Sequence, residues 1–354
     1  MKKGVLMKKI FILIAILTTF ACTNKDTITL NVFNWAEYID ETLLDQFEKE
    51  NNIKIDYEIF HNNEEMMAKF NNTKNYYDII VPSEYLIQEL IDEGKIEKLD
   101  YSKLPNVTKN ITQNLTNLEH DPGNLYSVPA YWGLMGILYN KTKIDLNDMQ
   151  GFDILFNKKY KKEITMLDSP KDNIGVALKK LGYSINEHDT DKIKEAGELL
   201  KIQNPLLIGY FSDVPAKSLM LNGEASIQLT WSGEAQSAML KNKNLDFYAP
   251  ENTNLWIDAF VIPIDAPNKN LAYKFINFLY ENEPSYKNFK ETRYNSPNKN
   301  VIKRIEEEAK NNPEMKLYLE EKFLPKDFSK FEIFKKIPKK IKEEILKIYL
   351  NLSS

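Results

Sequence analysis

Short apolar runs with β-strand character alternate along the chain with segments of helical period. Strands that alternate with helices form βαβ units, so the pattern predicts an α/β fold with mostly parallel sheets flanked by helices. The expected strands are Ile28–Phe33, Ile53–Phe60, Tyr77–Val81, Ile164–Leu167, Leu206–Tyr210, Ala225–Trp231, Leu245–Tyr248 and Asp258–Pro263. The expected helices include Leu43–Glu50, Glu64–Phe70, Tyr85–Glu93, Ile174–Leu181, Ile193–Leu200, Ala216–Leu221, Glu234–Leu240 and Leu271–Tyr280.

The length of the chain predicts the number of domains, and the pattern near its C-terminus predicts one more helix. A chain of 354 residues suggests about two domains. No break in composition separates them, so we expect two lobes between which the chain crosses more than once, at Ala130–Ile137 and Tyr248–Trp256. A last amphipathic helix is expected near the C-terminus. Its apolar face contains Ile341, Ile345, Ile348, Tyr349 and Leu352.

The N-terminus has the pattern of an export signal. Lys8 and Lys9 precede an apolar run, Ile10–Leu17, that is too short to span a bilayer. Cys22 follows this run and is the only cysteine, which excludes a disulfide framework. This arrangement resembles a bacterial lipoprotein: residues 1–21 would be removed, Cys22 would be lipidated and residues 22–27 would form a tether. The protein would then lie in the periplasm or on the outer face of the cell membrane. Secretion with an unmodified Cys22 is the alternative.

Charge and missing motifs exclude several classes of function. The net charge of −4 becomes −8 once the leader, with its four lysines and no acidic residue, is removed. Nucleic-acid-binding proteins usually carry a basic face, so no nucleic acid partner is expected. The sequence has neither a glycine-rich phosphate loop nor a zinc-binding pattern, so we expect no cofactor and no metal. Carboxylates are plentiful, which leaves a glycosidase with paired carboxylates as a remote alternative.

Aromatic and acidic residues recur together at the ends of expected strands. Trp35 and Glu37 stand at the end of the first strand, and Trp231 and Glu234 at the end of another. Glu84 and Tyr85 follow a third strand, and Trp256 stands two residues before Asp258. In open α/β sheets, ligands bind beyond the carboxyl ends of the strands. Tryptophan faces attract cations, and carboxylates accept strong hydrogen bonds from ammonium groups. The pattern therefore indicates a cleft for an extended aliphatic polyamine, although a tryptophan taken alone is more often a core residue.

Around these residues the sequence resembles the spermidine/putrescine-binding proteins of polyamine ABC importers. The resemblance covers nearly the whole chain after the leader. No single motif is specific, but several occur in the order of the family. They are Asn34–Tyr38, Asp78–Tyr85, Asp121–Asn140, Leu167–Gly175, Leu181–Asn186, Trp231–Gly233, Trp256–Asp258 and Tyr294–Asn298.

The resemblance implies a two-lobed type II periplasmic-binding-protein fold with its ligand in the cleft between the lobes. Residues 28–134 and 256–298 would form the first lobe, and residues 135–255 and 299–354 the second. The protein would be a monomer and no enzyme. It would capture spermidine, putrescine or both by hinge closure and deliver the ligand to an ABC permease. A polyamine sensor, or a receptor for another solute, is the alternative use of the same fold.

The resemblance also implies which residues contact the ligand. Asp258 would pair with an amine. Near Pro170 two choices stay open: Asp168 itself, or Ser169 together with Asp172. Glu332 is expected to add a polar contact from the C-terminal part. The remaining expected contacts are Trp35, Glu37, Tyr38, Ser83 and Tyr85 from the first lobe, and the aromatic walls Trp231, Trp256 and Tyr294.

Overall fold

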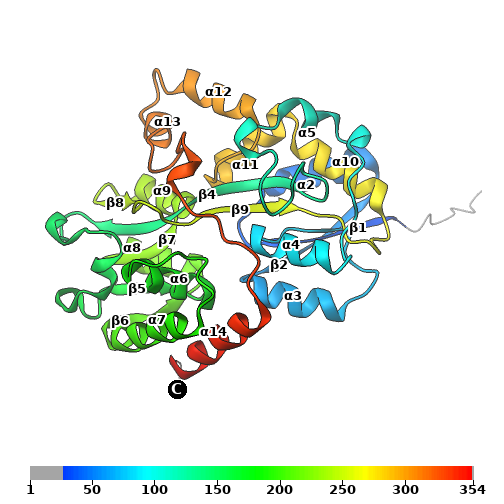
Figure 1. Ribbon diagram of the computed structural model, residues 1–354. Helices are drawn as coiled ribbons and strands as arrows, with labels where there is room; N and C mark the ends of the chain where they lie inside the picture. Colours follow the sequence, from blue (N-terminus) through cyan, green and yellow to red (C-terminus); the bar gives the residue numbers. More distant parts are fainter. Residues whose placement is uncertain (1–26, 353–354) are drawn as a thin grey trace, which may run out of the picture.

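A computed structural model describes residues 27–352. The expected export signal, Cys22 and the tether up to residue 26 lie outside the described residues. The chain forms two α/β lobes that are joined by long strands near the middle of the molecule (Figure 1). The expectation of a two-lobed α/β fold is confirmed.

The first lobe is built on a parallel sheet with the strand order β2-β1-β3. Along β1, Leu30 and Val32 pack in one core cluster and Phe33 in another, because successive side chains of a strand point to opposite faces. Helices therefore cover both faces of this sheet. The strands are β1 (Thr29–Trp35), β2 (Lys54–Phe60) and β3 (Ile79–Ile80), and the helices of this lobe are α2 (Glu41–Asn51), α3 (Asn63–Asn72), α4 (Glu84–Asp92), α5 (Pro105–Asn110), α10 (Lys269–Leu279) and α11 (Asn282–Thr292).

The second lobe is built on a mixed sheet with the strand order β6-β5-β7-β4-β8. Its strands β5, β6 and β7 are parallel to one another, and each is followed by a helix. The strands are β5 (Ile164–Leu167), β6 (Leu207–Phe211), β7 (Ile227–Trp231) and β8 (Leu245–Tyr248). The helices are α6 (Pro170–Lys180), α7 (Thr190–Gln203), α8 (Asp213–Asn222) and α9 (Ser232–Lys241).

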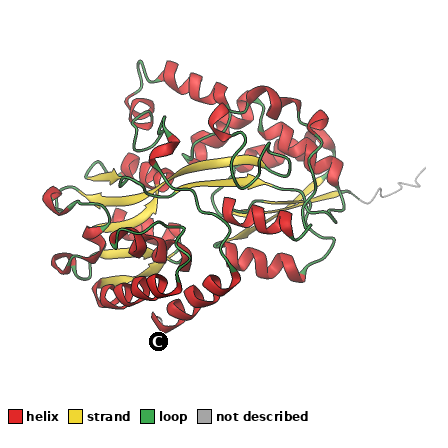
Figure 2. Cartoon of the chain, in the orientation of Figure 1, coloured by secondary structure: helices red, strands yellow, loops and turns green. Residues whose placement is uncertain are grey.

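The long strand β4 (Val128–Asn140) belongs to both lobes (Figure 2). Its first half pairs with β9 (Leu255–Phe260), and its second half, from Met135 onward, pairs with β7 and β8. All three pairings are antiparallel, so the expected mostly parallel arrangement holds for β1–β3 and for β5–β7 only. The crossing expected at Ala130–Ile137 is thus a strand. All its residues are buried, so its sequence lacks the polar alternation that would have indicated a strand.

One part of the chain departs from the expected division into lobes. Helices α12 (Lys299–Glu308) and α13 (Pro313–Tyr318) follow the expected boundary at residue 298. They nevertheless pack on α11 of the first lobe, where Phe289 contacts a cluster with Val301 and Ile305. The expected helices do not include α11 to α13, whose sequences are strongly polar.

The C-terminal helix α14 (Lys339–Leu352) packs on α6 and α7 of the second lobe. Ile341, Ile345 and Ile348 bury the face that the periodicity predicts. Lys342 also pairs with Glu89 of α4, so this helix touches the first lobe as well. No helix in residues 27–352 is both long and apolar enough to cross a membrane. Short 3₁₀ helices complete the chain: η1 (Tyr101–Lys103), η2 (Gln113–Leu115), η3 (Leu146–Asp148), η4 (Asp153–Phe156), η5 (Lys158–Tyr160), η6 (Asn204–Leu206) and η7 (Phe328–Lys330).

Candidate ligand-binding cleft

A cavity of about 380 Å³ lies between the two lobes. This volume is in the range of small-molecule sites, about 300–1,000 Å³. The segments that line it follow the carboxyl ends of β1, β2 and β3 in the first lobe and of β5, β6 and β7 in the second. Strand β9 and the residue Tyr294, just after α11, complete the wall. The fold thus brings together loops that are far apart in the sequence.

Aromatic rings form the side walls of the cavity. Trp231 packs edge-on against Trp256 at 5.9 Å between ring centroids, and Trp256 packs edge-on against Tyr294 at 5.2 Å. Tyr38 of the same lobe reaches Tyr294 at 5.1 Å between ring centroids. In edge-to-face packing the edge of one ring covers only one face of its neighbour, and the opposite face can contact a cation or a methylene chain.

Gly233 is required for this aromatic wall. A Cβ atom added to Gly233 would lie 2.4 Å from a ring carbon of Tyr294, far closer than van der Waals contact allows. Any larger residue would therefore push the Tyr294 ring out of its place. The glycine of the Trp231–Gly233 motif thus serves packing.

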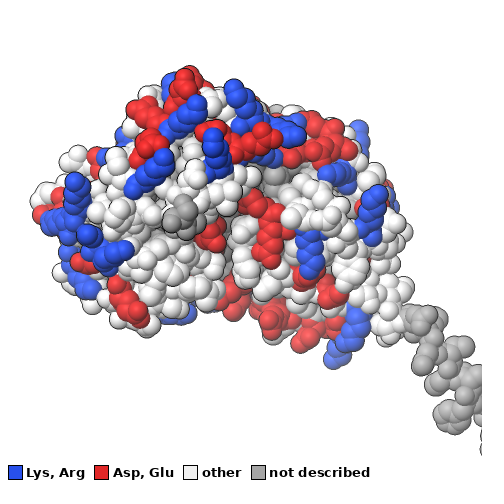
Figure 3. Space-filling view, turned by 90° about the horizontal axis from the view of Figure 1, so that it is seen from below, with Lys and Arg blue, Asp and Glu red and all other residues white. Residues whose placement is uncertain are grey.

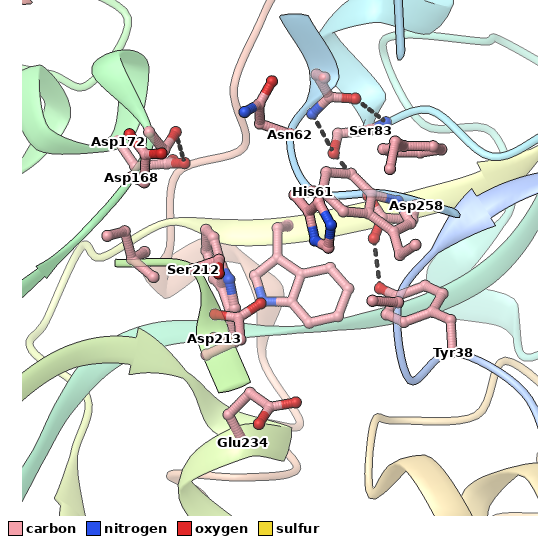
Figure 4. Close-up of a pocket in the computed structure, with 18 of the residues that line it drawn as sticks. Tyr38, His61, Asn62, Ser83, Asp168, Asp172, Ser212, Asp213, Glu234 and Asp258 are labelled. Carbon is pink, nitrogen blue, oxygen red and sulfur yellow. Dashed lines mark hydrogen bonds between the residues drawn. The ribbon is translucent and has the colours of Figure 1, made fainter. Parts of the chain in front are cut away.

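Asp258 is the first-lobe carboxylate that two hydroxyl groups hold in position in the cavity. The residue is only 4% exposed, and its carboxylate accepts hydrogen bonds from the hydroxyls of Tyr38 and Ser83, the latter at 2.6 Å (Figure 4). Burial raises the pKa of Asp258 to about 6, although the two hydroxyl donors oppose the shift. Ser83 stands at the N-cap of α4 without capping it, because its hydroxyl donates to Asp258.

A second acidic group, Asp213 and Glu234, faces the cavity from the second lobe (Figure 4). The Lys217 ammonium lies 2.6 Å from Glu234 and 3.0 Å from Glu37, so it joins the two lobes. Tyr294 donates a further hydrogen bond to Glu234 at 2.9 Å. The Oδ1 atom of Asp213 is buried and finds no hydrogen-bond partner in the described part of the chain. Burial, followed by the Glu234 carboxylate, raises the pKa of Asp213 to about 8.

A third acidic group lies at the start of α6. Asp172 is 4% exposed and accepts hydrogen bonds from the Ser169 hydroxyl at 2.5 Å and from the Lys171 ammonium at 3.0 Å. Asp168 is exposed and accepts a hydrogen bond from Tyr349 of α14 at 2.7 Å. Figure 4 shows Asp168 and Asp172 side by side, apart from Asp258. Both choices that the sequence left open therefore line the cavity.

Glu84 adds a fully buried carboxylate that is not among the expected ligand contacts. One of its oxygens accepts the backbone N–H of Ile257 at 3.0 Å. The other has no hydrogen-bond partner among residues 27–352. Burial raises the pKa of Glu84 to about 8, so its charge has little compensation in this environment.

Acidic side chains far outnumber basic ones around the cavity. Figure 3 shows Asp and Glu side chains along the seam between the lobes. Lys171 is the one lysine or arginine that lines the cavity within the described chain. In the same residues, no group of three or more His, Cys, Asp and Glu side chains could hold a metal ion. The acids that line the cavity are Glu37, Glu64, Glu84, Asp168, Asp172, Asp213, Glu234 and Asp258.

The structure brings nearly all of the expected site residues to this cavity. Glu332 is the exception and needs correction: its carboxylate binds Lys179 at 2.6 Å and the Ser184 hydroxyl, outside the cavity. The expected residues that line the cavity are Trp35, Glu37, Tyr38, Ser83, Tyr85, Asp168, Ser169, Asp172, Trp231, Trp256, Asp258 and Tyr294. The expected contacts do not include Glu84, Lys171, Asp213 and Glu234. Of these, Glu84 and Glu234 carry a signal in the sequence, since each stands near an aromatic residue at the end of a strand, as Glu37 stands near Trp35.

Comparison with known proteins agrees with this architecture. Residues 42–317 match the family model described as bacterial extracellular solute-binding protein. The chain is 36% identical over 288 residues to the spermidine/putrescine-binding periplasmic protein of Salmonella typhimurium. That match covers 81% of this chain and 82% of the relative.

Two solved structures extend the comparison. A protein of Listeria monocytogenes described as a spermidine/putrescine ABC transporter superimposes with a TM-score of 0.84 at 32% identity. The Tp0655 (TpPotD) lipoprotein of Treponema pallidum superimposes with a TM-score of 0.77 at 25% identity. Each match covers 92% of this chain and 99% of the other. The similarity therefore extends through both lobes.

Proposed function

The chain belongs to the bacterial extracellular solute-binding protein family, and we propose that it binds spermidine, putrescine or both in the cavity between its lobes. The observation that carries this proposal is the wall of Trp231, Trp256 and Tyr294, flanked by carboxylates from both lobes. An aliphatic chain gains about 25 cal/mol per Å² of apolar area that these rings cover. Ammonium groups gain charge-assisted hydrogen bonds from the carboxylates.

The carboxylates give each lobe its own anchor for an amine. Asp258 stands on β9 of the first lobe, and Asp213 stands at the start of α8 in the second. A ligand with an ammonium at each end would contact both and would bind the closed arrangement better than an open one. Without a cation, the acids of the two lobes repel one another, which favours opening. Capture would therefore proceed by hinge closure about β4 and β9.

The same proposal includes export and delivery. Lipidation of Cys22 would anchor the monomeric protein in the periplasm or on the outer face of the cell membrane. The loaded protein would then pass its ligand to an ABC permease. The names of the relatives support the ligand and the transport system, and the lipoprotein from Treponema pallidum offers a parallel for the anchor.

Thermal unfolding of the purified protein with candidate ligands tests this proposal. Spermidine, putrescine, spermine and cadaverine are compared with arginine and sugars. A ligand at about 100 times its dissociation constant adds about 2.7 kcal/mol, which raises the midpoint by several degrees. A shift with polyamines alone supports the proposal. If no polyamine shifts the midpoint, the function must be withdrawn. A protein that binds polyamine but never associates with a permease would be a sensor.

A further inference from the structure

Asn63 forms two hydrogen bonds with Ser83, one of the two residues whose hydroxyls donate to Asp258. Its Nδ2 atom donates to the Ser83 hydroxyl oxygen at 3.0 Å, and its Oδ1 atom accepts the Ser83 backbone N–H at 3.3 Å. Asn63 lines the cavity and is only 7% exposed. It is not among the expected ligand contacts. A buried amide thus stands next to a residue that holds a carboxylate of the site in place.

The start of α3 explains why this side chain is available. Two asparagines precede the acidic first turn of the helix. Asn62 fills the N-cap position, where its side-chain oxygen accepts the backbone N–H of Glu65 at 2.8 Å. Asparagine is favoured at this position. The Asn63 side chain therefore has no capping role and packs inward against Ser83.

The two contacts fix the direction of the hydrogen bonds. A side-chain amide has one accepting end and one donating end. The backbone N–H of Ser83 can only donate, so the accepting end of Asn63 faces it and the donating end faces the Ser83 hydroxyl. That hydroxyl in turn donates to Asp258 at 2.6 Å. A chain of donors therefore runs from Asn63 through Ser83 to the carboxylate, and such bonds strengthen one another.

This direction favours the charged form of Asp258. A carboxylate only accepts hydrogen bonds, whereas a protonated carboxyl group also donates one. Burial raises the pKa of Asp258 to about 6, and the bond from Ser83 opposes this rise. An ionised carboxylate that is held in place is the acceptor that a ligand ammonium requires.

We propose that Asn63 is a positioning residue of the ligand site: it orients the Ser83 hydroxyl as a donor and so keeps Asp258 ready to accept a ligand ammonium. This inference rests on the proposed function, because it requires an amine beside Asp258. Asn63 acts through Ser83 and does so without touching the ligand. A purely structural role, in which Asn63 only ties α3 to the start of α4, would not depend on the Ser83 hydroxyl.

Titration calorimetry with putrescine and spermidine at two pH values tests this inference on the purified protein. In Asn63→Ala, affinity should fall about threefold at pH 8 and about tenfold at pH 6, because Asp258 then holds its proton more often at the lower pH. In a Ser83→Ala background, Asn63→Ala should reduce affinity less than about twofold at either pH, since the hydroxyl that it orients is gone.

The Ser83→Ala background also separates Asp258 from its titratable surroundings. The charged or titratable neighbours of Asp258 are Tyr38, Glu84, Lys171, Asp172 and Tyr294, and His61 lines the same cavity. All of them are present in both backgrounds. A pH effect that one of them carries would therefore persist without the Ser83 hydroxyl.

Asn110→Ala is the matched control. Asn110 is a buried asparagine of α5 in the first lobe, 4% exposed, and lies outside the cavity. Its amide also donates one hydrogen bond and accepts another, with Tyr280 and Asn300 as partners. The substitution should lower the midpoint of thermal unfolding and leave polyamine affinity unchanged at both pH values.

The possible outcomes separate the inference from the proposed function. An unchanged affinity in Asn63→Ala overturns the inference, and so does an equal loss at both pH values. A loss of the same size with and without the Ser83 hydroxyl also overturns it. If Asn63→Ala does not fold, Asn63→Leu keeps the volume without the amide and serves as the second variant. A wild-type protein that binds neither polyamine overturns the proposed function, and the inference with it.

Discussion

Asp258 and Asp172 are equally buried, each 4% exposed, yet their surroundings differ. Asp258 accepts hydrogen bonds from two neutral hydroxyls, those of Tyr38 and Ser83. Asp172 accepts one from a hydroxyl and one from the Lys171 ammonium. Hydrogen bonds hold both side chains in place, but only Asp172 has a cation in direct contact. Asp258 is thus a preorganised acceptor for an incoming cation, whereas Asp172 has already received one.

The comparison shows that burial alone does not identify a binding carboxylate. A buried charge needs compensation, and the compensation can come from the chain or from a ligand. Where the chain supplies it, the site is complete without ligand. Where hydroxyls and backbone amides supply only part of it, as at Asp258 and Glu84, a cationic ligand would supply the rest under the proposed function.

The substitution with the largest expected effect is Asp258→Asn. It removes the charge but keeps the shape, so polyamine affinity should fall about 100-fold, or about 2.7 kcal/mol. The matched variant Asp172→Asn should reduce affinity for a diamine less than tenfold, because Lys171 already neutralises Asp172. Titration calorimetry measures both. An equal or greater loss in Asp172→Asn would contradict the comparison.

A pH effect comes next, because several carboxylates of the cleft hold protons in the ligand-free state. Burial raises the pKa of Glu84 from 4.5 and of Asp213 from 3.8, in both cases to about 8. The folded protein therefore binds more protons than the unfolded chain between about pH 4 and pH 8, and ligand-free stability should fall as the pH rises through this window. Polyamine binding needs the charged form, so affinity should rise about tenfold or more from pH 5 to pH 8.

Proton release on binding checks this effect. The charged groups that surround Glu84 are Lys171 and Asp258, and those that surround Asp213 are Glu234, Lys217, Glu37 and Asp172. Calorimetry at pH 7 in two buffers of different ionisation enthalpy should show that polyamine displaces protons. Glu84→Gln should reduce the number released. Equal binding enthalpies in both buffers would show that these carboxylates are already charged before binding.

A smaller effect is expected from the tryptophan beside Asp258. In Trp256→Phe, polyamine affinity should fall about fivefold to tenfold, because Trp is the strongest cation–π partner. Trp132→Phe is the control: Trp132 is 2% exposed, packs on Phe328 and lies outside the cavity. The indole N–H of each has no hydrogen-bond partner in the described chain, so neither change removes such a bond. Trp132→Phe should lower the midpoint of thermal unfolding, whereas calorimetry should show an unchanged affinity for polyamine.

The site residues that the sequence predicted are those whose position follows directly from the order of strands along the chain. Trp35 and Trp231 end strands of the two different sheets, and ligands bind beyond the carboxyl ends of such strands, so their place at the cleft followed from the strand pattern. Asp213 and Lys171 could not be recognised in this way. Their roles depend on which side chains lie across the cleft, and that depends on how the lobes are packed.

Two features escaped the pattern for different physical reasons. The crossing expected at Ala130–Ile137 exists, but its strand character was not recognised, because both faces of β4 are buried and its sequence lacks alternation. Glu332 was assigned to the cleft although it lies in an irregular segment, whose path depends on tertiary contacts. There it pairs in parallel with Asn254, and Lys179 binds its carboxylate. The pattern of apolar and polar residues near Glu332 in the sequence carries no information about either of these contacts.

The smallest effect on affinity should come from Gly233→Ala. This variant tests whether polyamine binding depends on the exact position of the Tyr294 ring in the aromatic wall. The added Cβ would lie 2.4 Å from the Tyr294 ring, and the ring must move. We expect about a threefold loss of polyamine affinity and a loss of about 1–3 kcal/mol in the free energy of unfolding. Gly197→Ala is the matched control: its Cβ would meet Ile348 at 2.9 Å, on helices away from the cleft. It should reduce stability by a similar amount and leave affinity unchanged. If the two variants lose affinity equally, the effect comes from general loosening of the fold rather than from the position of Tyr294.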